Sequence, residues 1–313
     1  MLLFNLGRMI VSSKLIESVR SVSLDVPDIA KAKTFYTQVW NLKVIDENEH
    51  AIFLTGSGQD HHLLALYQAE KLAIRDVTLR VKNQDAFKTI QALAEKAQGR
   101  VVSNIEKSTD PAGGSQLVIA DPQGRIYRLV YGDQLKPITE PVADQPIRLA
   151  HVVLNSAEVD LAQQFITDVL DFKLSDRTKI MAFMNCNRDH HSIAFGDTDN
   201  NALNHIAFLM KDVDSVMRGA GRMKDANHAV EWGPGRHGPG DNVFNYFIGP
   251  FGEVIEYTAE VEQIDDSYVT GYPENWTWPK GRTDQWGITQ QPSANLKEAQ
   301  KTTFFIPVQG ANE

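Results

Sequence analysis

Alternating apolar and polar residues mark the start of a repeated unit at four places along the chain. Because strand side chains point alternately to the two faces of a sheet, each place predicts a half-buried strand: Val19–Leu24, Asp76–Val81, Leu149–Leu154 and His205–Met210. Helical spacing and further short strands follow, for example the helices Ala30–Val39 and Leu161–Leu170 and the strands Ala51–Thr55 and Leu63–Tyr67. The pattern predicts an α+β fold of four βαβββ modules, paired into two homologous domains. Each domain is expected to be a curved mixed sheet that encloses a pocket.

The two halves of the chain also resemble each other in sequence, which indicates a duplication. Residues 21–44 align with residues 151–174 without a gap, residues 60–62 align with 189–191, and residues 121–128 align with 249–256. A Pro-rich, polar stretch lies between the halves, as expected of a linker. The predicted organisation is an N-terminal extension (1–14), an N-terminal domain (15–136), a C-terminal domain (148–260) and an aromatic tail (261–313) that packs on the domain or on a neighbouring subunit.

The duplication is broken at three polar positions. His151 aligns with Ser21, His205 aligns with Asp76, and Glu256 aligns with Arg128, while the apolar residues around each position match. Only the C-terminal half therefore keeps two imidazoles and a carboxylate. All three residues lie on predicted strands among apolar neighbours, where an unpaired carboxylate would be costly.

Two histidines and one carboxylate on one face of a metal leave open coordination positions, as in non-haem Fe(II) oxygenases. Mn(II) suits the same donors. A single histidine on a strand is more often a hydrogen-bonded core residue than a metal ligand. Three such residues at equivalent strand positions of a duplicated fold favour a metal site on His151, His205 and Glu256.

Charge and cysteine content narrow the remaining function classes. The 313 residues carry a formal net charge of -9 without a Lys/Arg cluster, which disfavours binding to nucleic acid or to an anionic membrane. The apolar start of the chain is too short to span a bilayer. Cys186 is the single cysteine, which excludes an intrachain disulfide and fits a reducing cytoplasm. We therefore expect a cytoplasmic protein that acts on a small molecule, and we expect a homo-oligomer, a tetramer or larger.

Over residues 15–260 the sequence resembles the type I extradiol ring-cleavage dioxygenases (catechol 2,3-dioxygenase-like) of the vicinal oxygen chelate superfamily. The family signature is Gly-x-His, a Tyr about eight residues later, then Asp-Pro-x-Gly and a Glu. Here it runs from Gly235 through His237, Tyr246 and Gly249-Pro-Phe-Gly252 to Glu256. Gly249 departs from the usual Asp at a position that is not a ligand. Residues 189–195 (DHHSIAF) are similar to the family's His-x-x-Ala-Phe strand.

The resemblance implies that a small aromatic diol and O2 are the substrates and that His191, His237 and Tyr246 are catalytic. In such enzymes the catechol chelates Fe(II) through both oxygens, the histidine of the His-x-x-Ala-Phe strand handles protons, and the other two residues hydrogen-bond the substrate oxygens. Imidazole titrates near neutral pH, which suits a proton-transfer role. Because His61 and His62 repeat the pair His190–His191 in the other half, the pair can also be a legacy of the duplication. Three further residues are candidates for supporting the ligands by hydrogen bonds: His190, Asn204 and Asp241.

Two alternatives remain open at this point. A glyoxalase-like isomerase or hydrolase of the same superfamily would use four protein ligands with two glutamates, and the strand at 192–195 lacks the second carboxylate. A non-catalytic protein that binds aromatic compounds would be expected to lack the three ligands. The identity of the catechol and the site of ring cleavage depend on the shape of the pocket.

Overall fold

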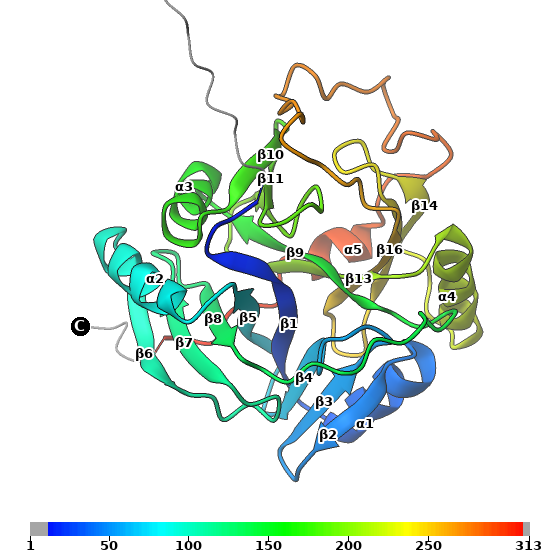
Figure 1. The fold of residues 1–313 in the computed structure, drawn as a ribbon. Coiled ribbons are helices and arrows are strands. Elements are labelled where there is room, and N and C mark those ends of the chain that lie inside the picture. Colours follow the sequence, from blue (N-terminus) through cyan, green and yellow to red (C-terminus); the bar gives the residue numbers. More distant parts are fainter. Residues whose placement is uncertain (1–11, 309–313) are drawn as a thin grey trace, which may run out of the picture.

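The computed structural model describes residues 12–308 and consists of two eight-stranded sheets that lie side by side (Figure 1). Residues 1–11 of the predicted N-terminal extension lie outside the described range. The first sheet contains β1 (Ile16–Val26), β2 (Lys43–Glu47), β3 (Ala51–Thr55), β4 (Leu64–Gln68), β5 (Ala73–Val81), β6 (Arg100–Lys107), β7 (Ser115–Ala120) and β8 (Ile126–Tyr131). The second contains β9 (Arg148–Ser156), β10 (Lys173–Arg177), β11 (Met181–Asn185), β12 (Ile193–Asp197), β13 (Leu203–Leu209), β14 (Trp232–Arg236), β15 (Val243–Ile248) and β16 (Val254–Ala259).

The two sheets have the same strand order, so the predicted fold class is confirmed. The orders are β2-β3-β4-β1-β5-β8-β7-β6 and β10-β11-β12-β9-β13-β16-β15-β14. One helix follows the first strand of each module: α1 (Ile29–Thr34), α2 (Asp85–Lys96), α3 (Val159–Leu170) and α4 (Val213–Asp225). Each sheet therefore consists of two βαβββ modules that meet at a central antiparallel pair, β1 with β5 and β9 with β13.

The helix expected at Ala30–Val39 consists of α1 and a π-helical segment, Phe35–Val39. Its aromatic residues are buried, and Tyr36 and Trp40 reach into the C-terminal half. The Trp40 ring stacks on Tyr257 with the ring centroids 3.6 Å apart, and the Tyr36 hydroxyl donates to Glu253 at 2.7 Å. These contacts join the two halves through one continuous hydrophobic core.

The register of three neighbouring strands brings the predicted ligands onto one face of the second sheet. Ala207 on β13 pairs with His151 on β9 and with Glu256 on β16. His205 lies two residues before Ala207 on β13, and residues two apart on a strand point to the same face. His151, His205 and Glu256 therefore project into the same space at the centre of the sheet.

After β16 the chain runs as an irregular tail across the C-terminal half to α5 (Ala294–Ala299), and Figure 1 shows it continuing from there to the first sheet. There the backbone of Ile74 on β5 donates to Phe304 and accepts from Ile306, both at 2.9 Å. None of the helices in residues 12–308 combines the length and the apolar character needed to cross a lipid bilayer.

Candidate metal centre

The three predicted ligands form a compact buried cluster. The Nε2 atoms of His151 and His205 lie 3.2 and 3.1 Å from Oε2 of Glu256, and 3.4 Å from each other. All three side chains are almost fully buried. The donor atoms thus face one another at the centre of the sheet.

The spacing and the charge of these donors fit a divalent cation. Ligand atoms in adjacent positions around an octahedral metal, at about 2.1 Å from it, lie about 3.0 Å apart. Burial opposes ionisation of Glu256, but the attraction of His151 and the close contacts with both imidazoles outweigh it and hold the pKa of Glu256 well below its usual range. Burial lowers the pKa of His205, which leaves its imidazole neutral. An ionised carboxylate and a neutral imidazole are the forms that bind a metal ion.

Hydrogen bonds orient the ring of His205. Its Nδ1 lies 2.8 Å from the side-chain oxygen of Asn204, which fixes Nδ1 as the donor and leaves Nε2 free for a metal. The Asn204 oxygen also accepts from Gln300 of the tail at 2.9 Å, and the Asn204 amide donates to Asn155 at 2.8 Å. Asn204 therefore holds the ring of His205 through a network that includes the tail.

A cavity of about 600 Å³ opens above the cluster. His151 and His205 lie in its wall together with the three residues predicted to be catalytic: His191, His237 and Tyr246. The ring centroids of His191 and His151 are 4.2 Å apart, and His237 Nε2 lies 3.0 Å from the Tyr246 hydroxyl. That hydroxyl is 3.5 Å from Nε2 of His205. The structure thus brings all six predicted ligands and catalytic residues to one site.

Burial keeps the three side chains that were predicted to be catalytic neutral. It lowers the pKa of His191 well below the usual range, and the neighbouring His151 adds to this effect. It also lowers the pKa of His237 to about 4. Burial raises the pKa of Tyr246, and the charge of Glu256 raises it further. At neutral pH the cavity therefore presents two neutral imidazoles and a protonated phenol.

The other two candidates for supporting roles differ in their placement. His190 is fully buried behind His191, with its Nδ1 3.1 Å from Nδ1 of His191. Asp241 lies on the surface loop after His237. Its carboxylate accepts from Gln285 at 2.7 Å and pairs with Arg236 at 3.5 Å. Neither Gln285 nor Arg236 is a predicted metal ligand. The two contacts therefore indicate that Asp241 stabilises the loop that carries His237.

Several residues that line the cavity were not predicted from the sequence to be part of the site. Trp276, Trp278 and Thr283 of the tail line the cavity, as do Trp232 and Gln300. The tail has no aligned partner in the duplicated halves, so no internal comparison could indicate which of its residues reach the site. A Cβ atom on Gly238 would lie 2.5 Å from the Trp278 ring, which shows how closely the tail packs against the loop that carries His237.

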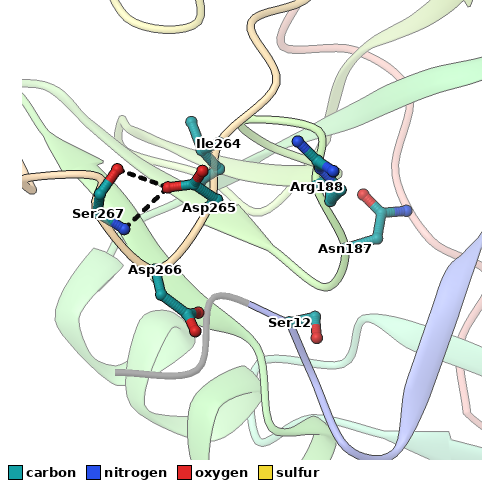
Figure 2. Close-up of a pocket in the computed structure, with 7 residues that line it drawn as sticks. All are labelled: Ser12, Asn187, Arg188, Ile264, Asp265, Asp266 and Ser267. Atoms are coloured by element: carbon teal, nitrogen blue, oxygen red, sulfur yellow. Dashed lines mark hydrogen bonds between the residues drawn. The ribbon is translucent and has the colours of Figure 1, made fainter. Parts of the chain in front are cut away.

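A second hollow, of about 520 Å³, lies away from these residues (Figure 2). Its wall consists of Ser12, Asn187, Arg188, Ile264, Asp265, Asp266 and Ser267. Figure 2 shows the Asp265 carboxylate accepting hydrogen bonds from the backbone and the hydroxyl of Ser267, at 2.9 and 2.6 Å. No predicted site residue is among those that line this hollow, so the chemistry is expected in the other cavity.

Comparisons with known proteins agree with this picture. The family model of the Glyoxalase/Bleomycin resistance protein/Dioxygenase superfamily matches residues 18–126 and 148–257, one match in each half. "Metapyrocatechase 2" of Cupriavidus necator is 27% identical over 290 residues, which is 85% of each chain. The "Manganese-dependent 2,3-dihydroxybiphenyl 1,2-dioxygenase" of Geobacillus genomosp. 3 is 22% identical over 253 residues, 73% of this chain and 80% of that one.

Among solved structures, the Mn(II)-bound glyoxalase from Novosphingobium aromaticivorans superposes with a TM-score of 0.85 at 31% identity. The match covers 90% of this chain and 94% of the other.

Proposed function

The chain belongs to the Glyoxalase/Bleomycin resistance protein/Dioxygenase superfamily, and on this premise we propose that it is an extradiol dioxygenase. It cleaves the ring of a catechol-type substrate next to its hydroxyls and incorporates both atoms of O2. The resident metal is Fe(II), and Mn(II) is the alternative. The observation that carries the proposal is that the His151–His205–Glu256 cluster faces a cavity whose wall also holds His191, His237 and Tyr246.

The three ligands would hold the metal through His151 Nε2, His205 Nε2 and one oxygen of Glu256. When bound, the cation supplies positive charge that lowers the pKa of a coordinated hydroxyl, and open positions for the diol and for O2. Because histidine binds a metal as the neutral imidazole and glutamate binds it as the carboxylate, the three ligands would contribute a single negative charge to the site. The divalent cation and the Glu256 carboxylate together would therefore carry a net positive charge. That charge favours a substrate that binds as an anion or loses a proton on binding.

The remaining residues handle protons and orient the substrate. His191 is neutral, so it can accept a hydroxyl proton of the diol and later return it. Tyr246 keeps its proton because its pKa is raised, so it acts as a hydrogen-bond donor. His237 contacts the Tyr246 hydroxyl and stacks on Phe244 with the ring centroids 4.0 Å apart, which fixes its plane. His191, His237 and Tyr246 would thus be the hydrogen-bonding groups around the bound diol.

The outer wall of the cavity favours an uncharged substituent on the ring. It is largely aromatic and aliphatic, with contributions from Phe183, Trp232 and Trp278. Its two charged side chains besides histidine, Lys179 and Asp197, are opposite in sign and exposed. A carboxylate on the substrate would therefore find no buried cation in this wall.

A glyoxalase activity is the second candidate, because the solved structure that is 31% identical bears that name. Against it, the three donors His151, His205 and Glu256 form the only His/Cys/Asp/Glu cluster with metal-ligand spacing among residues 12–308. A fourth protein ligand with a second carboxylate is therefore not in place. Non-catalytic binding of aromatic compounds is disfavoured for a different reason, since that role does not need the three ligands.

The deciding experiment is anaerobic reconstitution with Fe(II), and separately with Mn(II), followed by O2 uptake with a panel of catechols. The panel includes catechol, a phenyl-substituted catechol and a carboxylated catechol. We expect stoichiometric O2 uptake and a yellow ring-opened product. Metal-loaded protein that takes up no O2 with any catechol, but turns over methylglyoxal with glutathione, would establish the glyoxalase instead.

The proposal also covers the cellular location and the oligomeric state of the enzyme. We propose that it acts in the cytoplasm, which the single cysteine supports, and as a homo-oligomer of four or more subunits. Size-exclusion chromatography with light scattering tests the oligomeric state.

A further inference from the structure

Behind His191, away from the cavity, three buried polar side chains form a chain of hydrogen bonds. Oδ2 of Asp176 on β10 lies 2.8 Å from Nε2 of His190, and Nδ1 of His190 lies 3.1 Å from Nδ1 of His191. Asp176 and His190 are fully buried and His191 is 3% exposed. The chain therefore runs from a buried carboxylate to the wall of the cavity.

The surroundings of Asp176 determine where the protons lie. Its Oδ1 accepts from the backbone N–H of Gly271 at 2.7 Å, and its Oδ2 accepts from the Tyr268 hydroxyl at 3.0 Å. A carboxylate with these donors is an acceptor only. The third contact, with Nε2 of His190, therefore requires a hydrogen on that nitrogen.

The remaining protons follow from the chemistry of imidazole. A neutral imidazole has one N–H and one bare nitrogen. If His190 carries its hydrogen on Nε2, its Nδ1 is bare and must accept from Nδ1–H of His191. His191 then has a bare Nε2, and no residue within 12–308 forms a hydrogen bond to that atom. His191 lines the cavity, and Nε2 is the ring nitrogen that its contact with His190 leaves available there.

We propose that Asp176 and His190 are positioning residues that fix His191 in the tautomer with a bare Nε2. This rests on the proposed function, in which His191 accepts a hydroxyl proton from the diol. The proton leaves the substrate oxygen and bonds to Nε2, and the imidazolium that results is stabilised through its Nδ1–H by His190 and Asp176. The arrangement performs the same task as the aspartate in a Ser-His-Asp triad, which holds its histidine in the productive tautomer.

The N-terminal half contains the same pair of histidines without this function. His61 and His62 also lie with their Nδ1 atoms 3.1 Å apart. Asp46, which aligns with Asp176, is exposed. Both ring nitrogens of His62 contact the Arg20 guanidinium, at 3.0 and 2.7 Å. The pair of histidines is therefore common to both halves, whereas the buried carboxylate behind it and the bare nitrogen in front of it belong to the second half.

The direct test is nitrogen NMR of the full-length protein, labelled with 15N-histidine and loaded with diamagnetic Zn(II). Ring nitrogens with and without hydrogen differ strongly in chemical shift, so the tautomer can be read without catalysis. We expect His190 as the Nε2–H form and His191 as the Nδ1–H form. A wild-type His191 that carries its hydrogen on Nε2 would overturn the proposal, and this measurement needs no variant to fold.

The matched variants are Asp176→Asn and Asp46→Asn. An amide at 176 can donate to His190 Nε2, which reverses both tautomers and removes the base. With Fe(II) and catechol we expect kcat to fall by about 30-fold or more with KM changed less than about threefold, because the lost group acts in the transition state. Asp46→Asn should leave both constants unchanged. Tyr268→Phe should cost less than about fivefold, since Asp176 keeps its other two contacts.

A failure of the tautomer proposal can be distinguished from a failure of the dioxygenase proposal. Equal metal content, an unchanged circular dichroism spectrum and a kcat within threefold of wild type in Asp176→Asn would overturn the inference and leave the dioxygenase intact. If wild type takes up no O2 with any catechol, the dioxygenase fails, while the NMR result still decides whether Asp176 sets the tautomer.

Discussion

Each half of the molecule buries a carboxylate at the centre of its sheet, but the two carboxylates have different partners. At the centre of the first sheet the Asp76 carboxylate is buried and pairs with the Arg128 guanidinium at 3.0 Å. In the second sheet His205 takes the place of Asp76 and Glu256 takes the place of Arg128, and the Glu256 carboxylate is buried between His151 and His205. The N-terminal half thus carries its own cation on a side chain, whereas the C-terminal half needs a cation from outside. The comparison indicates that the metal centre is a charge-balanced core position from which the built-in cation has been removed.

The space in front of each centre differs as well. Arg20 is fully buried in the first half, where it contacts His62 and pairs with Asp110 at 2.9 Å. The aligned residue in the second half is Ala150, whose side chain is a single methyl group. The second half therefore differs from the first both in the missing Arg128 guanidinium and in the smaller side chain at the position of Arg20.

Removal of a metal ligand should have the largest effect. His151→Ala takes away one of three donors, so we expect metal content to fall from about one ion per chain to nearly none and catechol turnover to fall by at least about 10³-fold. Ser21→Ala is the control at the aligned position, because the Ser21 hydroxyl is buried without a hydrogen-bond partner. Elemental analysis and O2 uptake measure both. A metal-binding defect in Ser21→Ala would break the comparison.

Replacement of Arg128 should lower the stability of the protein and leave its catalytic activity unchanged. Arg128→Met leaves the buried Asp76 carboxylate without its positively charged partner, although Ser23 and Thr78 still donate to it, and is expected to lower the free energy of unfolding by about 3–5 kcal/mol. Asp76→Asn combined with Arg128→Met should recover most of it, because no charge then remains unpaired. Chemical denaturation measures the stability, and kcat per bound metal should stay unchanged. A double variant as unstable as the single one would show that the ion pair is not what Asp76 needs.

The sequence was enough to predict that His151, His205 and Glu256 lie together, because the strands and the duplication both constrain their positions. Alternation on β9, β13 and β16 determines which residues share a face, and the loss of matching at Ser21, Asp76 and Arg128 identifies the functional positions. Asp176 left a weaker signal, because its aligned partner Asp46 is also an aspartate and only burial distinguishes the two.

The tail could not be predicted in this way. It contains no long periodic element, and the contacts of Trp276, Trp278 and Gln300 with the cavity depend on how an irregular chain folds back over the sheet. Local patterns carry no information on such long-range contacts. The helix expected at Ala30–Val39 was right in place, but the pattern did not show that its second part would be π-helical.

A third pair of aligned residues predicts a smaller, pH-dependent effect. Arg125 in the first half is buried and pairs with Asp121 at 2.7 Å, whereas its counterpart Glu253 is buried with Tyr36 as its side-chain donor. Burial raises the pKa of Glu253 to about 7 from 4.5. Between these values the folded state holds a proton that the unfolded state has released. Stability from this group is therefore present below about pH 4.5 and lost as pH rises through 7.

Glu253→Gln should remove this dependence. The unfolding free energy of the variant minus that of wild type should rise between pH 4.5 and 7 by at most about 3 kcal/mol and then level off. The glutamine oxygen can still accept from Tyr36, so the cavity should be unaffected. Denaturation curves at half-unit pH steps measure the difference. A flat difference across this window would show that Glu253 is ionised in the folded protein.

The smallest effect is expected where the second half supports a ligand and the first half has no ligand to support. Asn204 accepts from Nδ1 of His205, whereas the aligned Arg75 pairs with Asp25 and lies over the Tyr67 ring. Asn204→Ala should weaken metal affinity by about 10-fold, because residues that orient a ligand typically contribute 10–100-fold. Gln300→Ala should weaken it less, since Asn204 then loses one of its contacts and keeps Asn155. Arg75→Ala should leave it unchanged. Competition with a metal-sensitive dye measures all three, and an affinity unchanged in Asn204→Ala would mean that strand register alone orients His205.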